Sequence, residues 1–423
     1  MKTTVNSIIR LLLIITLVAS VGPSLSAQKE NGNGNGFFII SGVVKDTKNK
    51  KKLSYASISI PGSHVGTITN EDGEFTLKLQ EWPPSKRIEV SHLGYYNLLY
   101  PIQENNPEKQ TILLTPNDNV LEEILVLGGN AQELVNQAIG KIATNYSGQD
   151  NLLTGFYRET IKKRRTYINV AEAVIQVYKT SYEKGIEKDR VQVLKGRQLL
   201  SQKPKDTLIV KLQGGPNLSV FTDVVKNRDM LFDPLTLPYY SFTFNEITMI
   251  DDRLNYVIDF KSQAILPFAP YYGKLYIDKE NLTFARAEIF LSMNDRNKAT
   301  QAILRKKPFG LRFKPEVVSF IITYKQRDGK SYLNYVRNEV EFKCDWKRRL
   351  FATGYTILAE MVVTDLAGRP ATEIPRQDAF KPTLSLSDRV SNFADADFWE
   401  NYNIIEPTES LENAVNKLKK QYR

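Results

Sequence analysis

The sequence predicts a mainly β protein. A small N-terminal β-sandwich of the seven-strand type comes first, followed by a large curved antiparallel sheet, or half-barrel, with helices at both ends. Short runs that alternate apolar and polar residues fill the first part of the chain, and longer runs of the same period follow. Helical spacing is confined to two segments, near residues 131 and 408.

The predicted sandwich spans residues 37–117. Its alternating apolar positions include Val43, Ile58, Phe75 and Val90, and the runs are separated by turn residues. Asp72-Gly73 predicts a hairpin turn between the runs at Ile68 and Phe75, because glycine accepts the positive φ that such turns need.

The order of these motifs carries a family resemblance. The stretches 41–46, 56–62, 66–75 and 88–95 together resemble the carboxypeptidase regulatory-like domain. That resemblance implies a transthyretin-type sandwich of the kind frequent in exported proteins of Bacteroidetes. One departure from the pattern is the long basic turn at 48–52.

The first residues predict export. Lys2 and Arg10 precede or flank an apolar core at 11–18, and small residues at 24–27 offer a cleavage site, so residues 1–27 are expected to be a signal peptide. An uncleaved N-terminal anchor is the alternative. No cysteine lies near that cleavage site, so we expect no lipoprotein anchor. The Asn-Gly repeat within residues 28–36 predicts a flexible linker. No transmembrane helix is expected in the mature chain.

Residues 118–129 are expected to link the sandwich to a second domain. Within them an acidic and then apolar run resembles the segment that follows the same module in TonB-dependent receptors. The candidate partner-binding residues are Leu121, Glu122, Glu123, Ile124, Leu125, Val126 and Leu127. Such a segment could add an edge strand to a TonB-type partner, whereas the alternative is a strand or linker packed on the protein itself. A receptor barrel is excluded, because ~22 strands of ~10 residues need more chain than remains.

Residues 130–423 are expected to form the second domain. An amphipathic helix is predicted over 131–146 and another from Thr408, which can cap it. Polar turns at 251–252, 279–281 and 327–329 predict hairpins. The expected strands are 167–178, 208–212, 242–250, 254–260, 273–278, 284–291, 317–324, 332–342 and 351–364.

A second resemblance concerns this domain. The meander with its motif at 272–278, followed by Arg286-Ala287-Glu288, looks like the half-barrel of periplasmic lipoprotein-carrier proteins. The segment from 398 to 409 is similar to the tail of uncharacterised Bacteroidetes proteins with the same N-terminal module. The first likeness implies an acyl chain held on the concave face, whereas an ordinary filled core explains the same aromatic residues.

The sequence offers no candidate for catalysis. A zinc carboxypeptidase needs two histidines and a glutamate on the metal, and the two histidines of the chain, His64 and His92, both lie in the sandwich without a His-x-x-Glu spacing. Cys344, the single cysteine, is expected to be a buried structural thiol. Paired carboxylates at 251–252 and at Asp395 and Asp397 are expected to be turn residues, and no cofactor or metal is predicted.

The chain is basic, with a formal charge of +10 that falls to +8 without Lys2 and Arg10. The basic clusters lie at 48–52, 162–165, 305–307 and 347–349, all at predicted turns, where solvated charges protect edge strands. No nucleic-acid motif accompanies them, so nucleic acid is not an expected partner. Anionic membranes or acidic glycans are the alternative that these clusters allow.

The sequence therefore predicts a non-enzymatic exported protein, located in the periplasm or at the outer membrane. Its expected role is that of a binding or scaffold module for an envelope protein or a lipid. A periplasmic lipid or lipoprotein carrier is one alternative, and a degenerate hydrolase is another.

Overall fold

The computed structural model describes residues 37–103, 108–117, 130–206, 210–212, 214–346, 351–367, 370–392 and 398–422, and Phe37–Arg423 form one compact unit. The predicted signal peptide (1–27), the linker (28–36) and the segment 118–129 lie outside the described residues.

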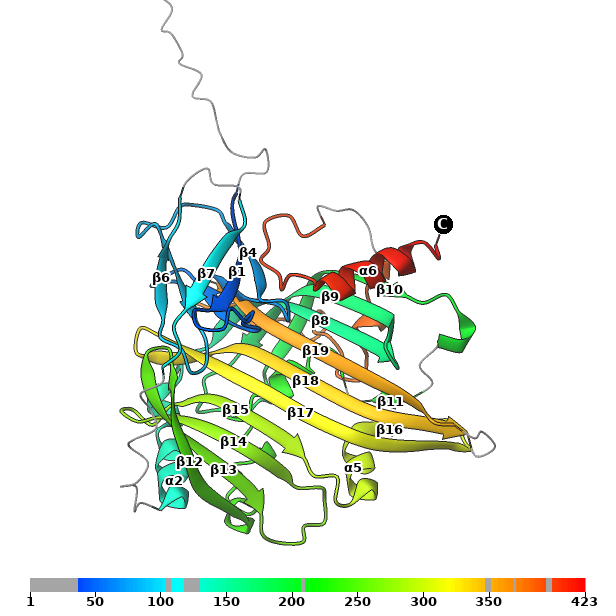
Figure 1. The fold of residues 1–423 in the computed structure, drawn as a ribbon. Coiled ribbons are helices and arrows are strands. Elements are labelled where there is room, and N and C mark those ends of the chain that lie inside the picture. Colours follow the sequence, from blue (N-terminus) through cyan, green and yellow to red (C-terminus); the bar gives the residue numbers. More distant parts are fainter. Residues whose placement is uncertain are drawn as a thin grey trace, which may run out of the picture. The chain divides into compact units, whose positions relative to one another are not determined.

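Two small sheets build the N-terminal sandwich (Figure 1). The first has the order β4 (Glu74–Leu79), β1 (Phe38–Asp46), β7 (Gln110–Leu114). The second has the order β3 (Gly66–Ile68), β2 (Ser57–Ser59), β5 (Arg87–Ser91), β6 (Leu98–Pro101). Their inward side chains share one core, which includes Ile40, Phe75 and Leu77 from the first sheet and Ile58, Ile88 and Val90 from the second. The predicted seven-strand sandwich is confirmed.

The turn at Asp72-Gly73 exists, but the hairpin predicted there is wrong. Gly73 has φ of 70° and donates its N–H to Asn70 O at 3.0 Å. The strands on either side belong to different sheets, because β3 pairs with β2 and β4 pairs with β1. The chain uses this turn to cross from one layer of the sandwich to the other.

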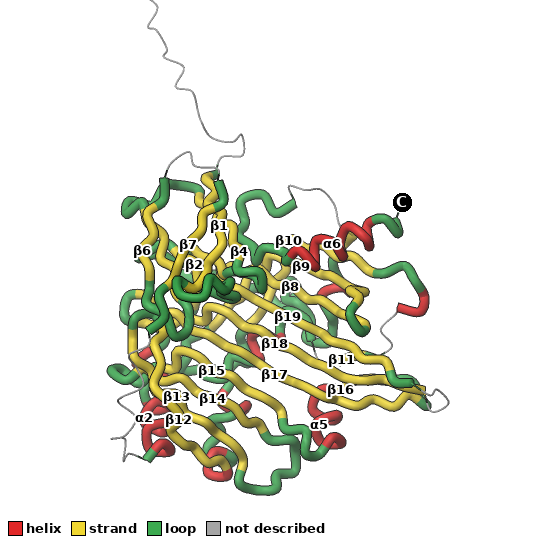
Figure 2. Tube along the Cα trace, in the orientation of Figure 1, coloured by secondary structure: helices red, strands yellow, loops and turns green. Residues whose placement is uncertain are grey.

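A single large sheet dominates the rest of the described chain. It runs antiparallel from β12 to β10, and the short β20 adds to β10 in parallel (Figures 1 and 2). In sheet order the strands are β12 (Tyr240–Ile250), β13 (Arg253–Ser262), β14 (Tyr271–Asp278), β15 (Phe284–Leu291), β17 (Leu311–Arg327), β18 (Lys330–Trp346), β19 (Thr353–Leu366), β8 (Asn151–Lys163), β9 (Thr166–Lys179), β10 (Arg190–Leu200) and β20 (Ser391–Asn392). The sheet does not close, because β12 and β20 are its two edges.

The three predicted hairpin turns are confirmed. The turns at 251–252, 279–281 and 327–329 join β12 to β13, β14 to β15 and β17 to β18, each an antiparallel pair. Aspartates serve the first turn because Asp251 and Asp252 both adopt the left-handed region, with φ of 50° and 56°.

Two long strands, β8 and β10, and two short ones, β16 (Leu304–Lys306) and β20, were not expected from the sequence. β8 and β10 lie on either side of the expected β9. β19, the last long strand in the sequence, pairs with β8, the first strand of the domain. β11 (Lys211–Leu212) and β16 (Leu304–Lys306) form a separate short pair.

The helices of the described residues are short (Figure 2). The predicted first helix is divided into α2 (Ala131–Gly140) and α3 (Ile142–Asn145), with α2 capped by Asn130. The predicted last helix is α6 (Glu409–Lys419), and Leu411 N donates to its cap Thr408 Oγ1 at 3.2 Å. α4 (Leu218–Phe221) and α5 (Arg296–Ile303) were not predicted.

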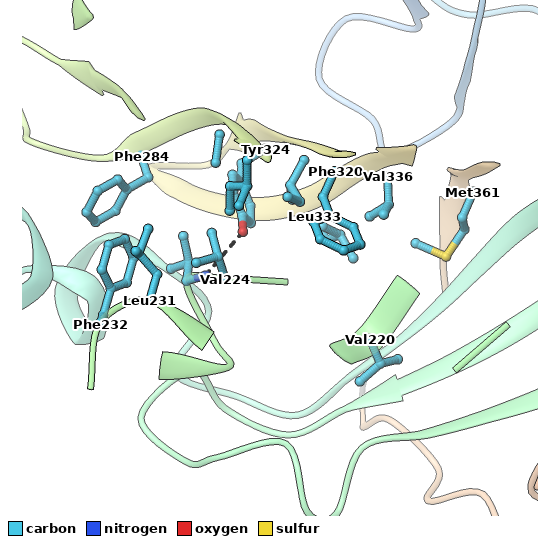
Figure 3. Packing of buried hydrophobic residues seen from close by; sticks show 14 of the residues in the cluster. Val220, Val224, Leu231, Phe232, Phe284, Phe320, Tyr324, Leu333, Val336 and Met361 are labelled. Atoms are coloured by element: carbon cyan, nitrogen blue, oxygen red, sulfur yellow. Dashed lines mark hydrogen bonds between the residues drawn. The ribbon is translucent and has the colours of Figure 1, made fainter. Parts of the chain in front are cut away.

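One face of the large sheet is filled by the protein's own side chains (Figure 3). Val220, Val224, Leu231 and Phe232 come from the segment between β11 and β12. They pack against residues of the sheet that include Phe284, Phe320, Tyr324, Leu333, Val336 and Met361. We call this the inner face and the opposite one, which carries Phe156, Val174, Tyr335 and Val362, the outer face.

Candidate functional site between the sandwich and the sheet

The sandwich packs on the outer face of the large sheet. Ile68 of β3 shares a buried cluster with Phe156, Val174, Tyr335 and Val362 of the sheet. Trp399 and Ile405, from the segment before α6, complete that cluster. The two parts are therefore joined by an apolar contact as well as by the polar contacts described next.

Two basic side chains of β17 hold the sandwich at one side of this contact. Lys325 Nζ lies 3.1 Å from Glu89 Oε2 and 3.6 Å from Asp251 Oδ1. Arg327 Nε donates to Ser63 O at 2.7 Å, and its Nη1 lies 3.6 Å from Glu89 Oε2. Burial alone would raise the pKa of Glu89, but the charges of Lys325 and Arg327 hold it below its ordinary value. Glu89 therefore stays ionised and anchors β5 to β17.

An aromatic and ionic cluster holds the centre. Arg337 Nη1 donates to Tyr55 OH at 2.6 Å, and the guanidinium lies 5.0 Å from the centre of that ring. Tyr55 stacks on Tyr335 with 5.8 Å between ring centres, and Tyr335 donates its hydroxyl proton to Glu360 at 2.7 Å. Burial, and then Glu360, raises the pKa of Tyr55, so its hydroxyl remains protonated.

The aspartate turn of β12 and β13 joins the same interface. Asn97 N donates to Asp252 Oδ1 at 2.7 Å, and Gly94 N donates to Met249 O at 2.8 Å. Gly94 has φ of 80°, which suits glycine, so the chain can place its N–H against β12. Asp252, expected to be a chance turn residue, therefore also binds the sandwich to the sheet, whereas Asp251 pairs with Lys325 inside the sheet.

A cavity with both apolar and polar walls lies where these contacts leave space. It has a volume of about 550 Å³ counted out to its mouth, and its walls come from the sandwich, the aspartate turn and the outer face. Its polar lining includes Ser91, His92, Asp251, Arg286, Lys325 and Asn334. We call this the interface cavity.

Both histidines lie beside the interface but in separate cavities. His92 lines the interface cavity; its Nδ1 and Nε2 each lie 3.1 Å from a carbonyl oxygen, of Leu93 and Ser54 respectively. Burial lowers the pKa of His92, so the neutral ring is favoured. His64 lines a neighbouring cavity of about 420 Å³ and meets Tyr332 edge-on at 4.9 Å.

A third cavity, of about 350 Å³, lies where the C-terminal segment crosses the outer face. Arg158 lies beside it and donates to Glu172 Oε1 at 2.8 Å and to Ile405 O at 2.7 Å. Arg197 Nε donates to the other oxygen of Glu172 at 2.9 Å and stacks over Trp399 at 4.7 Å. Burial would raise the pKa of Glu172, but the two guanidinium groups lower it.

Buried charges also lie on the inner face, and no sequence pattern indicates them. Lys179 Nζ lies 2.9 Å from Asp223 Oδ2, and Lys226 Nζ lies 2.8 Å from Asp189 Oδ1. Tyr182 and Tyr324 donate to Asp223 at 3.0 and 2.6 Å. Burial, and then the charge of Lys179, lowers the pKa of Lys226 to about 8. None of these four charged groups reaches the surface, so we assign the cluster to the structure of the core.

Glu159 is a further buried acid that the sequence did not single out. Burial raises its pKa to about 7, although Tyr157 donates a hydrogen bond to it at 3.2 Å. Its position in β8 faces the loop of Gly214 and Gly215 on the inner side of the sheet.

The residues singled out from the sequence are placed as follows. Leu121, Glu122, Glu123, Ile124, Leu125, Val126 and Leu127 lie outside the described residues, as do Asp395 and Asp397. Cys344 is buried in β18, and burial raises the pKa of its thiol to about 11. Within the described part of the chain, no three His, Cys, Asp or Glu side chains are grouped as a metal site would require. No helix within that part has both the length and the apolar character needed to cross a membrane.

Comparisons with known proteins find one sequence relative, a family model and two distantly similar solved structures. Part of the chain is 26% identical over 116 residues to the TonB-dependent receptor SusC of Bacteroides thetaiotaomicron, which is 27% of this chain and 10% of the receptor. The chain thus matches only about a tenth of the length of that relative.

Two solved structures are distantly similar. One is a DUF1329 family protein from Desulfovibrio piger, with 10% identity and a TM-score of 0.25 over 58% of this chain and 95% of that chain. The other is a protein of unknown function from Bacteroides fragilis, described as membrane-associated, with 8% identity and a TM-score of 0.15 over 78% of this chain and 99% of that chain. Residues 40–126 match the model of the CarboxypepD_reg-like domain, and the described part of this match is the sandwich.

Proposed function

We propose that this protein is a non-enzymatic binding or scaffold protein of the bacterial envelope, and that the sandwich and the outer face of the sheet form its binding site together. The observation that carries the proposal is the interface cavity, whose polar lining comes from both parts of the chain. The regulatory-like domain and the distant receptor relative are compatible with a non-catalytic role in the envelope.

The chemistry of the cavity favours a small polar ligand or the end of a peptide. Its charged lining consists of Arg286, which pairs with Glu288 at 2.8 Å, and of Lys325 and Asp251, which pair with each other at 3.6 Å. Asn334, Ser91 and His92 add neutral donors and acceptors. Such a mixed lining can fix the orientation of a ligand that carries both an amino and a carboxyl group.

A substitution that fills the cavity tests this proposal. Ala285 lines the cavity, so Ala285→Trp would occupy it without removing any of its ion pairs. Ala302→Trp, at an exposed position of α5, is the matched control. We expect native mass spectrometry of the protein purified from its own envelope to show a bound polar molecule in the wild type and in the control, and not in Ala285→Trp.

Two results would contradict the proposal. One is a wild-type protein without any bound molecule, and the other is the same molecule retained by Ala285→Trp. Retained material that contains acyl chains would instead support the lipid or lipoprotein carrier. That alternative requires an acyl chain to displace Val220, Val224, Leu231 or Phe232, which cover the inner face in this structure.

We also propose a partner of the TonB type for the segment Leu121–Leu127. The family match extends to residue 126, and the receptor relative is TonB-dependent by its name. An extended segment of alternating side chains can add a strand to the edge of a partner's sheet. We expect the periplasmic domain of TonB to bind the full chain and not a chain in which 121–127 are replaced by Gly and Ser. Equal binding by both chains, or by neither, would remove this partner.

A further inference from the structure

Basic clusters that are far apart in the sequence meet at one end of the large sheet. The registers pair Leu311 of β17 with Trp346 of β18, Cys344 with Thr353 of β19, and Tyr355 with Lys163 of β8. The end of β17 that begins at Leu311, the β8–β9 turn and the start of β19 therefore share one edge of the molecule (Figure 1).

Two phenylalanine side chains at this end are exposed to solvent. Phe309, just before β17, is 99% exposed, and Phe351, just before β19, is 80% exposed. Single exposed apolar residues are common, but a fully exposed aromatic ring gives up the burial that most phenylalanines obtain. Here two such rings lie at the same end of the sheet.

Exposed cations lie at the same end of the sheet as the two rings. Arg164 and Arg165 form the β8–β9 turn, and Arg305, Lys306 and Lys307 are separated from Phe309 by Pro308 alone; all five side chains are exposed. We call these five residues, together with Phe309 and Phe351, the basic end. The cluster at 305–307 was expected at a turn, but its first two residues belong to the strand β16.

Three acids near this end, among the residues that the structure describes, are paired with other cations. Asp345 Oδ2 lies 2.6 Å from Arg312, Glu316 Oε1 lies 2.7 Å from Lys343, and Asp206 Oδ1 lies 3.4 Å from Lys163. Each acid is thus paired with a cation that is not one of the five. The basic end keeps its positive charge.

We propose that the basic end docks on the surface of a bilayer rich in anionic phospholipid, with Phe309 and Phe351 inserted between the head groups. Charge complementarity supplies the long-range attraction, because each Lys or Arg near an anionic surface strengthens binding. Apolar insertion supplies the part that a soluble polyanion cannot, because a phenylalanine ring gains free energy when it leaves water for the boundary of the acyl chains. The site is separate from the interface cavity, so either proposal can fail without the other.

Sedimentation with vesicles tests the docking. The protein is purified after export and mixed with vesicles of phosphatidylglycerol and phosphatidylethanolamine, or of phosphatidylcholine alone. We expect binding to the anionic vesicles at low salt, weakening as salt rises, and at least about tenfold weaker binding to phosphatidylcholine.

Two sets of variants separate charge from insertion, each with a matched control. The combined change Arg305→Gln, Lys306→Gln and Lys307→Gln should weaken binding by about tenfold or more, whereas Lys50→Gln, Lys51→Gln and Lys52→Gln in the sandwich should leave it unchanged. Phe309→Ser with Phe351→Ser should weaken binding by about tenfold. Ile265→Ser with Phe268→Ser removes two exposed apolar residues from the loop after β13 and should leave it unchanged.

A spectroscopic readout keeps the test independent of sedimentation. In Phe351→Trp, the emission of the new indole should shift to shorter wavelength on anionic vesicles and be quenched by brominated lipid. Absence of binding at low salt would overturn the proposal. Vesicle binding that neither set of variants changes would also overturn it. The same holds if the protein binds dextran sulfate as tightly as it binds vesicles and the phenylalanine variant binds both as the wild type does.

Discussion

At the scale of single residues, the outer face depends on buried acids that are matched by more than one cation. Glu172 is 3% exposed and receives one guanidinium on each carboxylate oxygen, from Arg158 and Arg197. Removing the acid would leave two arginines in the contact with the C-terminal segment without their carboxylate. Such a loss is far more costly than the loss of an ion pair in water.

Glu172→Ala is therefore expected to lower the free energy of unfolding by about 3 to 5 kcal/mol. Glu74 forms an ion pair with Lys109 at 2.7 Å, but Glu74 is only half-buried and Lys109 is exposed. Glu74→Gln is the control and should cost less than about 1 kcal/mol. Urea unfolding of the two variants measures the difference, and equal effects would show that burial of the Arg158–Glu172–Arg197 network contributes nothing.

Glu159 makes the stability of the protein depend on pH, because its pKa is raised in the folded state. Its pKa is about 7 in the folded protein and 4.5 in the unfolded chain, so between these values the folded state binds more protons. Stability must then fall as the pH rises from about 4.5 to about 7, because burying the ionised form becomes necessary.

Glu159→Gln removes this titration. Relative to the wild type, the variant should gain on the order of 2 kcal/mol of stability between pH 5 and pH 8. Comparing urea unfolding of both proteins at the two pH values cancels the groups they share. A difference that stays constant with pH would show that Glu159 titrates normally.

At the scale of elements, the segment before α6 acts as a strap between the sandwich and the sheet. Asn403 accepts from Lys78 N at 2.7 Å and donates to Lys78 O at 3.1 Å, so its side-chain amide pairs with β4 as a backbone amide would. Thr67 donates to Ile404 O at 2.9 Å, and Asn70 donates to Pro407 O at 3.1 Å.

Asn403→Asp should loosen this strap, because it replaces the donor to Lys78 O with a second acceptor. We expect faster proteolytic cleavage in residues 398–408, with little change in the sheet. Ser410→Ala, at an exposed position of α6, is the control. Cleavage at the wild-type rate in Asn403→Asp would mean that the amide pairing does not hold the segment.

The elements also show how far the sequence could predict the structure. β15 matches its predicted bounds, because one face of it is wet and its residues alternate. β8 was missed because most of its residues after Gly155 are buried on both faces, and Arg158 and Glu159 are polar residues inside it. β10 was missed because a bulge between Val193 and Lys195 breaks its period.

The candidate site was harder to predict than the fold. Its residues come from β5, the β12–β13 turn and β17, which are brought together only by the packing of the sandwich on the sheet. A lysine such as Lys325, on an alternating strand, predicts a solvent-facing position. Nothing in the sequence indicates that Glu89 lies opposite it.

At the scale of the whole molecule, the sandwich is part of one compact unit with the sheet. Apolar packing around Ile68, the ion pairs of Lys325 and Arg327, and the Tyr55–Arg337 cluster all cross the contact. This joining allows residues of the two parts to line one binding site, and it requires the sandwich and the sheet to open as one unit.

Hydrogen exchange of the whole chain along a denaturant series tests that claim most directly. We expect one common free energy of opening for strands β2 and β5 of the sandwich and for β17 to β19 of the sheet. Lys325→Glu places a third carboxylate beside Glu89 and Asp251, so it should lower this free energy for all five strands. A sandwich that opens at lower free energy than the sheet, and whose exchange Lys325→Glu does not change, would contradict it.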